Sequence, residues 1–322
     1  MDLGLLKDRH GIESQANALL SEYTTFRLGG PCRAMINCGC VADFLAASEE
    51  LQQAGESWLT IGAGSNLVVA DSGIDANIIR FVSPQAEIEE EQDGIRVGAG
   101  TLLSDLCAYA IERQYSNFTY CVGIPGTVGG AVAGNAGAFG RQIGDELIEA
   151  RVLDFDGRVK ILDAEEMEFA YRDSILKHSQ GILLSALFRK LEGDGDAIRK
   201  EAAETIAFRR KRHPDYHAVP TAGSFFRNIE PSSAAERRKA AGWFLEEAGA
   251  LDMQVGGAGV FERHANIIVK ISPDCKSSDV VELALKMQEA VRERFGIKLR
   301  REVKIIGVEK PEISVAEVPQ QV

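Results

Sequence analysis

Two glycine-rich segments in the first half of this 322-residue chain constrain its fold more than any other feature. Residues 62–66 (GAGSN) directly follow residues 58–61 (WLTI), which we expect to form a strand. Residues 123–140 form the second segment, in which Phe139 is the only aromatic side chain. Glycine permits positive φ and close approach of the backbone, so successive amides can face phosphate oxygens. Tight turns or close packing would explain either segment alone, but both in one domain favour a dinucleotide-like ligand.

Neither segment matches the common nucleotide-binding motifs. No G-x-G-x-x-G opens a helix within a βαβ unit, and the phosphate-loop pattern G-x-x-x-x-G-K-[ST] is absent from the sequence. The sequence therefore predicts a ligand held by glycine backbones on a fold other than the dinucleotide-binding βαβ sheet.

The charge balance excludes several classes of partner. The chain has 48 acidic and 36 basic residues, a net charge of −12, so it repels a polyphosphate backbone and we expect no nucleic-acid partner. No run of 18 apolar residues occurs, and the first residues do not resemble a secretory signal. We therefore expect no membrane partner and a cytoplasmic location, and we infer no obligate protein partner.

The six cysteines indicate neither a disulfide framework nor a metal site. They are scattered along the chain, which is typical of reduced thiols in a cytosolic protein. Cys38 and Cys40 form a C-x-C pair, but no second pair or histidine cluster completes a tetrahedral set. We expect no bound metal.

The order of expected elements favours an α+β fold. Helical patterns cover residues 41–54, 196–212, 232–248 and 278–295, whereas short strands are expected at 58–61, 78–81, 94–98 and 298–306. Residues 220–228 are expected to be a loop, and Asp156-Gly157 suits the turn of a hairpin over 150–162. Strands and helices alternate without a regular βαβ rhythm, so the α+β class is expected, with a domain boundary near 192–195.

Two features of the second half could carry chemistry. Ser224 lies between a glycine and two aromatic residues, where its hydroxyl could donate a proton, although a loop or capping serine has the same pattern. The basic run of residues 209–213 ends an expected helix. Cations there complement the helix dipole, and they could also bind a diphosphate; neither role excludes the other.

Taken together, the motifs resemble the UDP-N-acetylenolpyruvoylglucosamine reductase family, in its shorter type. They occur in family order from about Asn17 to Gly307, nearly the whole chain. The matching segments are Asn17 with 24–30 (TTFRLGG), 62–67 (GAGSNL), 123–131 (GIPGTVGGA), 135–140 (NAGAFG), 171–174 (YRDS), 223–228 (GSFFRN), 256–258 (GGA) with 264–266 (HAN), and Glu302-Val303.

The resemblance implies a vanillyl-alcohol-oxidase (PCMH) type FAD-binding fold of two subdomains, with a C-terminal α+β substrate-binding domain. We expect an N-terminal segment at 1–24, the FAD-binding domain at 25–192, the substrate-binding domain at 193–308 and a flexible tail at 309–322. FAD is expected to be bound non-covalently by residues of the two glycine segments. These are Gly62, Ala63, Gly64, Ser65, Asn66, Gly123, Pro125, Gly126, Gly129, Gly130, Asn135, Gly137 and Ala138.

The resemblance also implies roles for single residues. Ser224 matches the proton donor, and Arg172 with Glu302 matches the pair that stabilises an enolate-like intermediate. Arg212 matches a basic residue near the substrate phosphates, and Asn228 a further substrate contact. The chain departs from the family pattern at four positions, which leaves details of substrate contact open. They are Gly134, Ile229, Phe261 and Lys270.

The implied reaction belongs to peptidoglycan precursor synthesis. NADPH reduces FAD and leaves, and the enolpyruvyl ether of a UDP-sugar then takes hydride at its methylene carbon and a proton from Ser224. The alternative is a FAD-dependent oxidase of a sugar or hydroxy acid on the same fold, because one fold hosts many functions. Such an oxidase would not need Ser224, Arg172 and Glu302 together.

Overall fold

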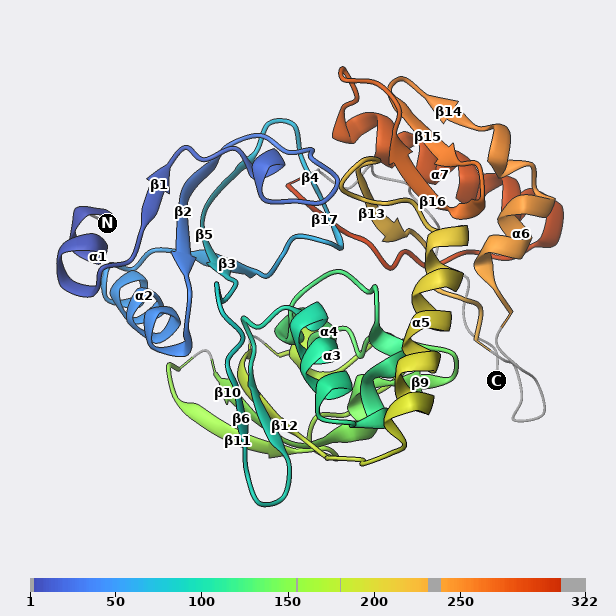
Figure 1. Cartoon of the computed structure of the whole chain (residues 1–322). Helices are drawn as coiled ribbons and strands as arrows, with labels where there is room; N and C mark the ends of the chain where they lie inside the picture. The colour runs from blue at the N-terminus through green and yellow to red at the C-terminus, as the bar shows by residue number, and fades with distance from the viewer. Residues whose placement is uncertain (1–2, 155, 180, 231–238, 308–322) are drawn as a thin grey trace, which may run out of the picture.

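The computed structural model describes residues 3–154, 156–179, 181–230 and 239–307, which form three α+β units (Figure 1). The first unit contains a four-stranded sheet in the order β1-β2-β5-β3, in which β2 and β3 run parallel to β5. Helix α2 packs against β2 and β5 through the apolar side chains of Phe44 and Leu51. The elements of this unit are α1 (Leu3–His10), β1 (Ser14–Ala16), β2 (Cys32–Cys38), α2 (Val41–Gln53), β3 (Trp58–Ile61), β4 (Leu67–Val69) and β5 (Ile74–Phe81).

The second unit is built on a five-stranded antiparallel sheet in the order β11-β10-β12-β7-β6. Helix α4 lies on β7 and β12, and the long α5 packs against α3 and the turn at Ser116–Cys121 (Figure 1). The elements are β6 (Ile88–Glu90), β7 (Ile95–Gly98), α3 (Leu103–Glu112), α4 (Val128–Ala133), β8 (Gly137–Ala138), β9 (Arg141–Gln142), β10 (Leu147–Leu153), β11 (Val159–Asp163), β12 (Ile182–Phe188) and α5 (Gly195–Arg212).

The third unit is an antiparallel sheet in the order β13-β16-β15-β14, against which α6 and α7 pack. One apolar cluster spans the first and second units, whereas a separate cluster fills the third and takes in Phe26, Leu28 and Val68. The elements are β13 (Thr221–Ser224), α6 (Ala241–Glu247), β14 (Gln254–Val255), β15 (Ala258–Phe261), β16 (His264–Lys270), α7 (Ser277–Phe295) and β17 (Lys304–Ile306).

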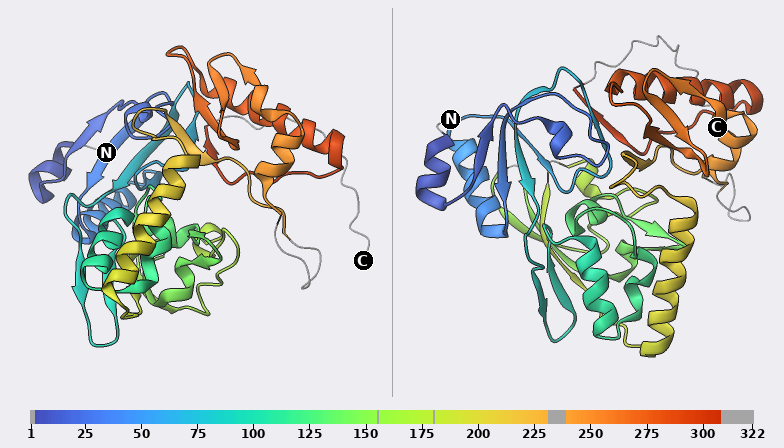
Figure 2. Two further views of the ribbon diagram at one scale, coloured as in Figure 1. Left: turned by 45° about the vertical axis from the view of Figure 1, so that its right-hand side comes forward. Right: turned by 45° about the horizontal axis from the view of Figure 1, so that its top comes forward.

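The third unit is fastened to the first by both strand pairing and helix capping. Strand β17 returns to the first unit and pairs in parallel with β4, and Figure 2 shows this return from two sides. Asp71 of the first unit accepts the backbone N–H groups of Ser277 and Ser278 at the start of α7, at 2.9 and 3.3 Å. Glu302 lies two residues before β17, so the pairing of β17 with β4 brings Glu302 to the place where the units meet.

Most expected elements are present, and the α+β class is confirmed. The expected loop at 220–228 was wrong in part, because residues 221–224 pair with β16 across an irregular register. The strand expected over 298–306 forms only at 304–306, where β4 supplies a partner. The helix expected over 232–248 falls partly on residues outside the described ones, and its described helical part is Ala241–Glu247.

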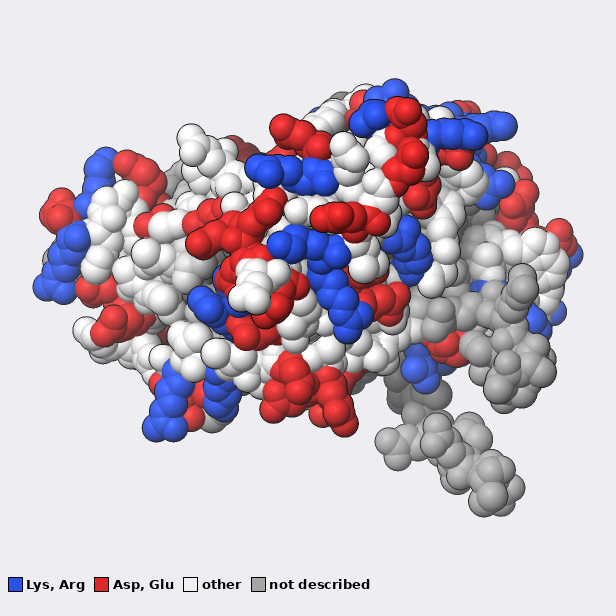
Figure 3. All heavy atoms as spheres, turned by 60° about the horizontal axis from the view of Figure 1, so that its bottom comes forward, with Lys and Arg blue, Asp and Glu red and all other residues white. Residues whose placement is uncertain are grey.

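The division of the chain at 192/193 stays a prediction, as does the flexible tail, which lies outside the described residues. Helix α5, placed by that division in the third domain, packs against elements of the second unit. In the described part of the chain, no helix is long and apolar enough to cross a membrane. Acidic and basic side chains are interspersed over the face shown in Figure 3. All six cysteines are free thiols.

Candidate active site

The three units meet around one cleft of about 700 Å³. This volume is within the range of cofactor and small-molecule sites, which is about 300–1,000 Å³. Its lining comes from both glycine segments, from α5 and from the third unit, so residues far apart in sequence share one space. Among the described residues, no group of three or more metal-ligating side chains is placed to hold an ion.

The two glycine segments face each other across the first and second units. The Ser65 hydroxyl donates to the Pro125 carbonyl at 3.0 Å, and a Cβ at Gly62 would lie 2.5 Å from Thr127 Oγ1. Thr127 in turn caps α4 by accepting the Gly130 N–H at 3.3 Å. We call residues 62–66 and 123–130 the glycine wall of the cleft.

The glycines of this wall have two different reasons to be glycine. Gly64 has a φ of +64°, and a Cβ there would lie 2.1 Å from the Tyr23 carbonyl oxygen, so close packing demands it. A Cβ at Gly130 would meet only Thr127 Oγ1, at 3.6 Å, so packing does not demand this glycine. Gly130 lines the cleft, and its missing side chain lets a ligand approach the backbone.

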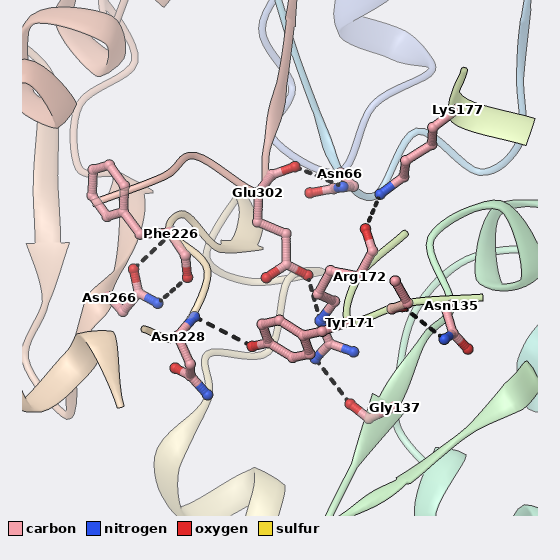
Figure 4. A network of polar contacts seen from close by, with 11 residues as sticks. Asn66, Asn135, Gly137, Tyr171, Arg172, Lys177, Phe226, Asn228, Asn266 and Glu302 are labelled. Carbon is pink, nitrogen blue, oxygen red and sulfur yellow. Dashed lines mark hydrogen bonds and ion pairs between the residues drawn. The ribbon is translucent and has the colours of Figure 1, made fainter. Parts of the chain in front are cut away.

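A second set of cleft-lining residues has polar or charged side chains. We call this set the polar wall; it consists of Arg172, Lys177, His213, Ser224 and Glu302. Arg172 Nε lies 2.9 Å from Glu302 Oε1, and Arg172 Nη2 donates to the Gly137 carbonyl at 2.9 Å (Figure 4). The Arg172 and Glu302 side chains are 24% and 19% exposed, so their ion pair is largely shielded from water. Three predicted catalytic residues thus line a single cleft.

The loop that carries Arg172, and the loop of Asn135 and Phe139 behind it, contain residues in the strained left-handed conformation. Among the described non-glycine residues, only seven have positive φ, and Asn135, Phe139, Glu168 and Arg172 are four of them. The buried Asn135 side chain donates to the Ala170 carbonyl at 2.8 Å and accepts the Gly144 N–H at 3.0 Å. It therefore holds the loop that carries Arg172. Asn135 is the one predicted cofactor-binding residue that is not among the described residues lining the cleft.

Burial and charge set the protonation of the polar wall. Burial raises the pKa of Glu302, and Arg172 and Lys177 oppose that rise. Burial, with Arg227 nearby, lowers the pKa of Lys177 to about 8. Burial and the neighbouring His264 lower the pKa of His213 to about 4, so this imidazole is neutral near pH 7.

Ser224 is placed by the sheet of the third unit. It ends β13 opposite Ile267, directly after Gly223, whose φ is +77°. The chain beyond it is held by the buried Asn266, whose side-chain amide exchanges hydrogen bonds with both the N–H and the C=O of Phe226, at 2.9 and 2.8 Å (Figure 4). Ser224 therefore lies on the edge strand of this sheet, where it lines the cleft.

The two predicted substrate-binding residues lie at or beyond the border of the cleft. Arg212 is exposed, and its guanidinium lies over the ring of the cleft-lining Phe208, 5.0 Å from the centroid. The Asn228 N–H donates to the Tyr171 hydroxyl at 3.2 Å, and its side-chain oxygen accepts the Ala241 N–H at 3.1 Å, at the start of α6. Both roles stay predictions.

Sequence reasoning missed several cleft residues. Arg209 lines the cleft and donates to the Tyr120 carbonyl at 3.1 Å, while burial lowers its pKa. It belongs to the basic run of residues 209–213, for which a diphosphate role was weighed, but only Arg212, one helical turn further on, was singled out as a substrate contact. Lys177 and His213 also line the cleft. The only feature of the sequence that could have pointed to Lys177 is its position five residues after Arg172.

Comparisons with known proteins agree with this arrangement. A family model for an FAD-binding domain matches residues 32–163. A model for the C-terminal domain of UDP-N-acetylenolpyruvoylglucosamine reductase matches residues 213–306. The first match includes both glycine segments and the second includes Ser224 and Glu302, whereas Arg172 and Lys177 lie between the two matches.

Whole-chain relatives carry the same name. UDP-N-acetylenolpyruvoylglucosamine reductase of Halalkalibacterium halodurans is 34% identical over 92% of this chain and 95% of its own length. That of Bacillus subtilis is 33% identical over 94% and 97%. The crystal structure of the reductase from Thermus caldophilus superposes with a TM-score of 0.74 at 29% identity, covering 92% and 98% of the two chains. The predicted FAD-binding fold with a third domain is thereby confirmed, and the chain belongs to the UDP-N-acetylenolpyruvoylglucosamine reductase family.

Proposed function

We propose that this chain is a FAD enzyme that uses NADPH to reduce UDP-N-acetylglucosamine enolpyruvate to UDP-N-acetylmuramate. The observation that carries the proposal is the convergence of Ser224, Arg172 and Glu302 on one cleft with both glycine segments. The curated relatives, which match over nine-tenths of the chain, are reductases of this name. A cytoplasmic location stays a prediction.

The residues of the glycine wall fit FAD. The cleft has a suitable volume, and Gly130 leaves its backbone open to a close ligand. Arg209 adds a cation on the same cleft, which suits a diphosphate. We infer that FAD is held without a covalent bond. When bound, FAD would accept hydride from NADPH and deliver it to the methylene carbon of the enolpyruvyl group.

Arg172 and Glu302 would stabilise charge on the reacting substrate. Negative charge develops on the substrate carboxylate as the hydride arrives, and a fixed guanidinium in a shielded site stabilises it. Glu302 orients that guanidinium through the 2.9 Å contact, and the Gly137 carbonyl holds its other end. Because burial raises the pKa of Glu302, this carboxyl can also carry a proton more readily than a solvated glutamate.

Ser224 would supply the proton to the adjacent substrate carbon. A serine hydroxyl has a pKa far above the optimum for general acids, so its position must matter more than its acidity. The pairing of β13 with β16 and the hydrogen bonds of Asn266 to Phe226 support this role, because they fix the backbone next to Ser224.

Arg212 and Asn228 are the proposed contacts to the UDP-sugar. Arg212 lies beside Phe208 at the mouth of the cleft, where an exposed guanidinium can reach a diphosphate. Asn228 supports the site by joining Tyr171 to the start of α6.

An anaerobic titration tests the proposal against the oxidase alternative, which is the less supported of the two. Addition of NADPH should bleach the flavin absorbance, and the enolpyruvyl UDP-sugar should restore it with one equivalent. If sugars or hydroxy acids bleached the flavin and oxygen restored it, while the UDP-sugar had no effect, the chain would be an oxidase.

A further inference from the structure

Lys177 ends a short turn of helix, Ile175–Lys177, and its side chain points back along its own loop. Its ammonium donates a hydrogen bond to the backbone carbonyl of Arg172 (Figure 4). Lys177 is half-buried and lines the cleft. A lysine directed at a neutral carbonyl beside a catalytic arginine calls for a reason, because the ammonium loses hydration there without gaining a carboxylate partner.

The conformation of Arg172 supplies that reason. Ala170 and Asp173 exchange backbone hydrogen bonds of 3.1 Å, so Tyr171 and Arg172 form the tip of a tight turn. Arg172 has a φ of +57°, a left-handed conformation that costs free energy for a residue with a side chain. Such a conformation persists only where neighbouring groups hold it.

The turn is held from both sides. Asn135 holds the carbonyl of Ala170 before the tip, and Lys177 holds the carbonyl of Arg172 at the tip. With the backbone so fixed, the Arg172 guanidinium reaches both Glu302 and the Gly137 carbonyl.

We propose that Lys177 is a positioning residue of this active site, which acts by holding the Arg172 carbonyl so that the Arg172 guanidinium is delivered to Glu302. The proposal rests on the proposed function for its kinetic consequences, but the hold on the turn does not depend on the substrate. Lys177 touches Arg172 rather than the reacting atoms, so it acts through that residue.

The surroundings of Lys177 give the hold a pH dependence. Arg227 and Lys304 repel its charge, and Asp173 and Glu302 attract it, while the Asp173 carboxylate is itself engaged by His178 at 2.9 Å. Burial is the largest influence, and the pKa of Lys177 is lowered to about 8. The neutral amine above that pH is a weaker donor than the ammonium. Substrate reduction should therefore decline as the pH rises through about 8.

The test compares Lys177→Met, Lys177→Gln and the control Lys190→Met. Lys190 donates an equivalent bond to the Glu91 carbonyl at 2.8 Å, away from the cleft. In stopped-flow experiments, Lys177→Met should leave flavin reduction by NADPH nearly unchanged. It should slow flavin reoxidation by the UDP-sugar about ten- to a hundredfold, the loss expected for a charge-assisted hydrogen bond. The alkaline decline near pH 8 should vanish in this variant.

Lys177→Gln keeps an N–H donor without the charge, so it should recover part of the rate and still lack the alkaline decline. Lys190→Met should behave as wild type. Equal slowing of both half-reactions, or an alkaline decline that persists in Lys177→Met, would overturn the proposal.

Hydrogen–deuterium exchange gives a readout that needs no turnover. The amides of Ala170 and Asp173 should exchange faster in Lys177→Met than in wild type, and exchange as slow as in wild type would also overturn the proposal. If wild-type flavin were not reoxidised by the UDP-sugar, the proposed function would fail, while faster exchange in Lys177→Met would still support the hold on the turn.

Discussion

The glycine wall and the polar wall obtain their shapes by opposite means. In the glycine wall, left-handed backbone is adopted at Gly64, Gly123 and Gly126, where no side chain opposes it. In the polar wall, the same region of backbone space is occupied by Arg172, and by Asn135 in the loop behind it. In the glycine wall this conformation is allowed because the residues have no side chain. In the polar wall, hydrogen bonds from neighbouring side chains must stabilise it.

The difference separates binding from chemistry. A glycine backbone offers amides and close approach but no titratable group, which suits a cofactor that stays in place. The polar wall holds, beside Arg172, a glutamate whose pKa burial raises and a lysine whose pKa burial lowers. Substitutions in the glycine wall should thus affect cofactor retention and stability, and those in the polar wall should affect turnover and its pH dependence.

Among these variants, Ser224→Ala should have the largest effect on a reaction rate. It changes the polar wall and leaves the glycine wall intact. FAD binding and flavin reduction by NADPH should persist, because neither needs a proton from serine. Flavin reoxidation by the UDP-sugar should fall by about 100- to 10,000-fold, the range of a general acid. Stopped-flow measurement of each half-reaction checks this, and Ser224→Cys should recover part of the rate. Equal slowing of the two half-reactions would return Ser224 to a structural loop residue.

Gly64→Ala changes the glycine wall and leaves the side chains of the polar wall intact. Its Cβ would lie 2.1 Å from the Tyr23 carbonyl oxygen at a φ of +64°, so the loop must move. We expect a loss of about 2–4 kcal/mol in the free energy of unfolding, from overpacking and backbone strain together. Urea denaturation measures the loss, and the released flavin measures cofactor retention.

Gly140→Ala is the matched control for this change. Gly140 has a φ of +82°, but nothing lies within 4 Å of the added Cβ, so only the backbone term remains. That term is about 1–2 kcal/mol. If both substitutions cost the same, the contact with Tyr23 would contribute nothing and close packing would not explain Gly64.

The glycine wall could be predicted from sequence because each of its segments is contiguous. Residues 62–66 follow an apolar strand, and the two glycine-rich segments together indicated a ligand. The pattern could not separate Gly64, required by packing, from Gly130, which opens the cleft, because that depends on atoms of other segments.

The polar wall could not be predicted from local pattern, since Arg172, Ser224 and Glu302 come from distant parts of the chain. The resemblance alone singled them out together. The same non-local pairing explains the errors in the fold: residues 300–302 bond individually to Phe225 and Arg227 across the site and join no strand. Lys177 was missed because its role depends on a turn conformation that no spacing reveals.

His213 tests whether pH acts through the polar wall. Its pKa is about 4 in the folded chain and 6.5 in an unfolded one, so the unfolded state binds more protons between these values. Stability should be at its full value above pH 6.5 and should fall as the pH drops towards 4. Because the imidazole is partly exposed, we expect a contribution of about 1–2 kcal/mol.

The measurement compares urea denaturation of wild type and His213→Gln from pH 7 to pH 4. Because glutamine does not titrate, the difference between the two curves should shrink as the pH falls. Titrating groups that do not interact with His213 cancel in the difference. A difference independent of pH would mean that His213 is not held neutral by its surroundings.

Arg212→Ala should have the smallest effect, because Arg212 lies at the exposed edge of the site rather than in the polar wall. Its guanidinium is already over the Phe208 ring, so it is pre-placed for the substrate diphosphate at little cost in side-chain freedom. Water and salt screen an exposed charge, so we expect a loss of about 1 kcal/mol, or about a fivefold rise in KM with kcat nearly unchanged. Arg210→Ala removes another exposed charge from the same turn of α5, so it controls for net charge and should leave KM unchanged. If both substitutions raised KM equally, the net charge of the helix end would matter and Arg212 would have no specific contact. If Arg212→Ala lowered kcat as strongly as it raised KM, Arg212 would contribute to the chemical step as the polar wall does. The end of α5 would then take part in both substrate binding and chemistry.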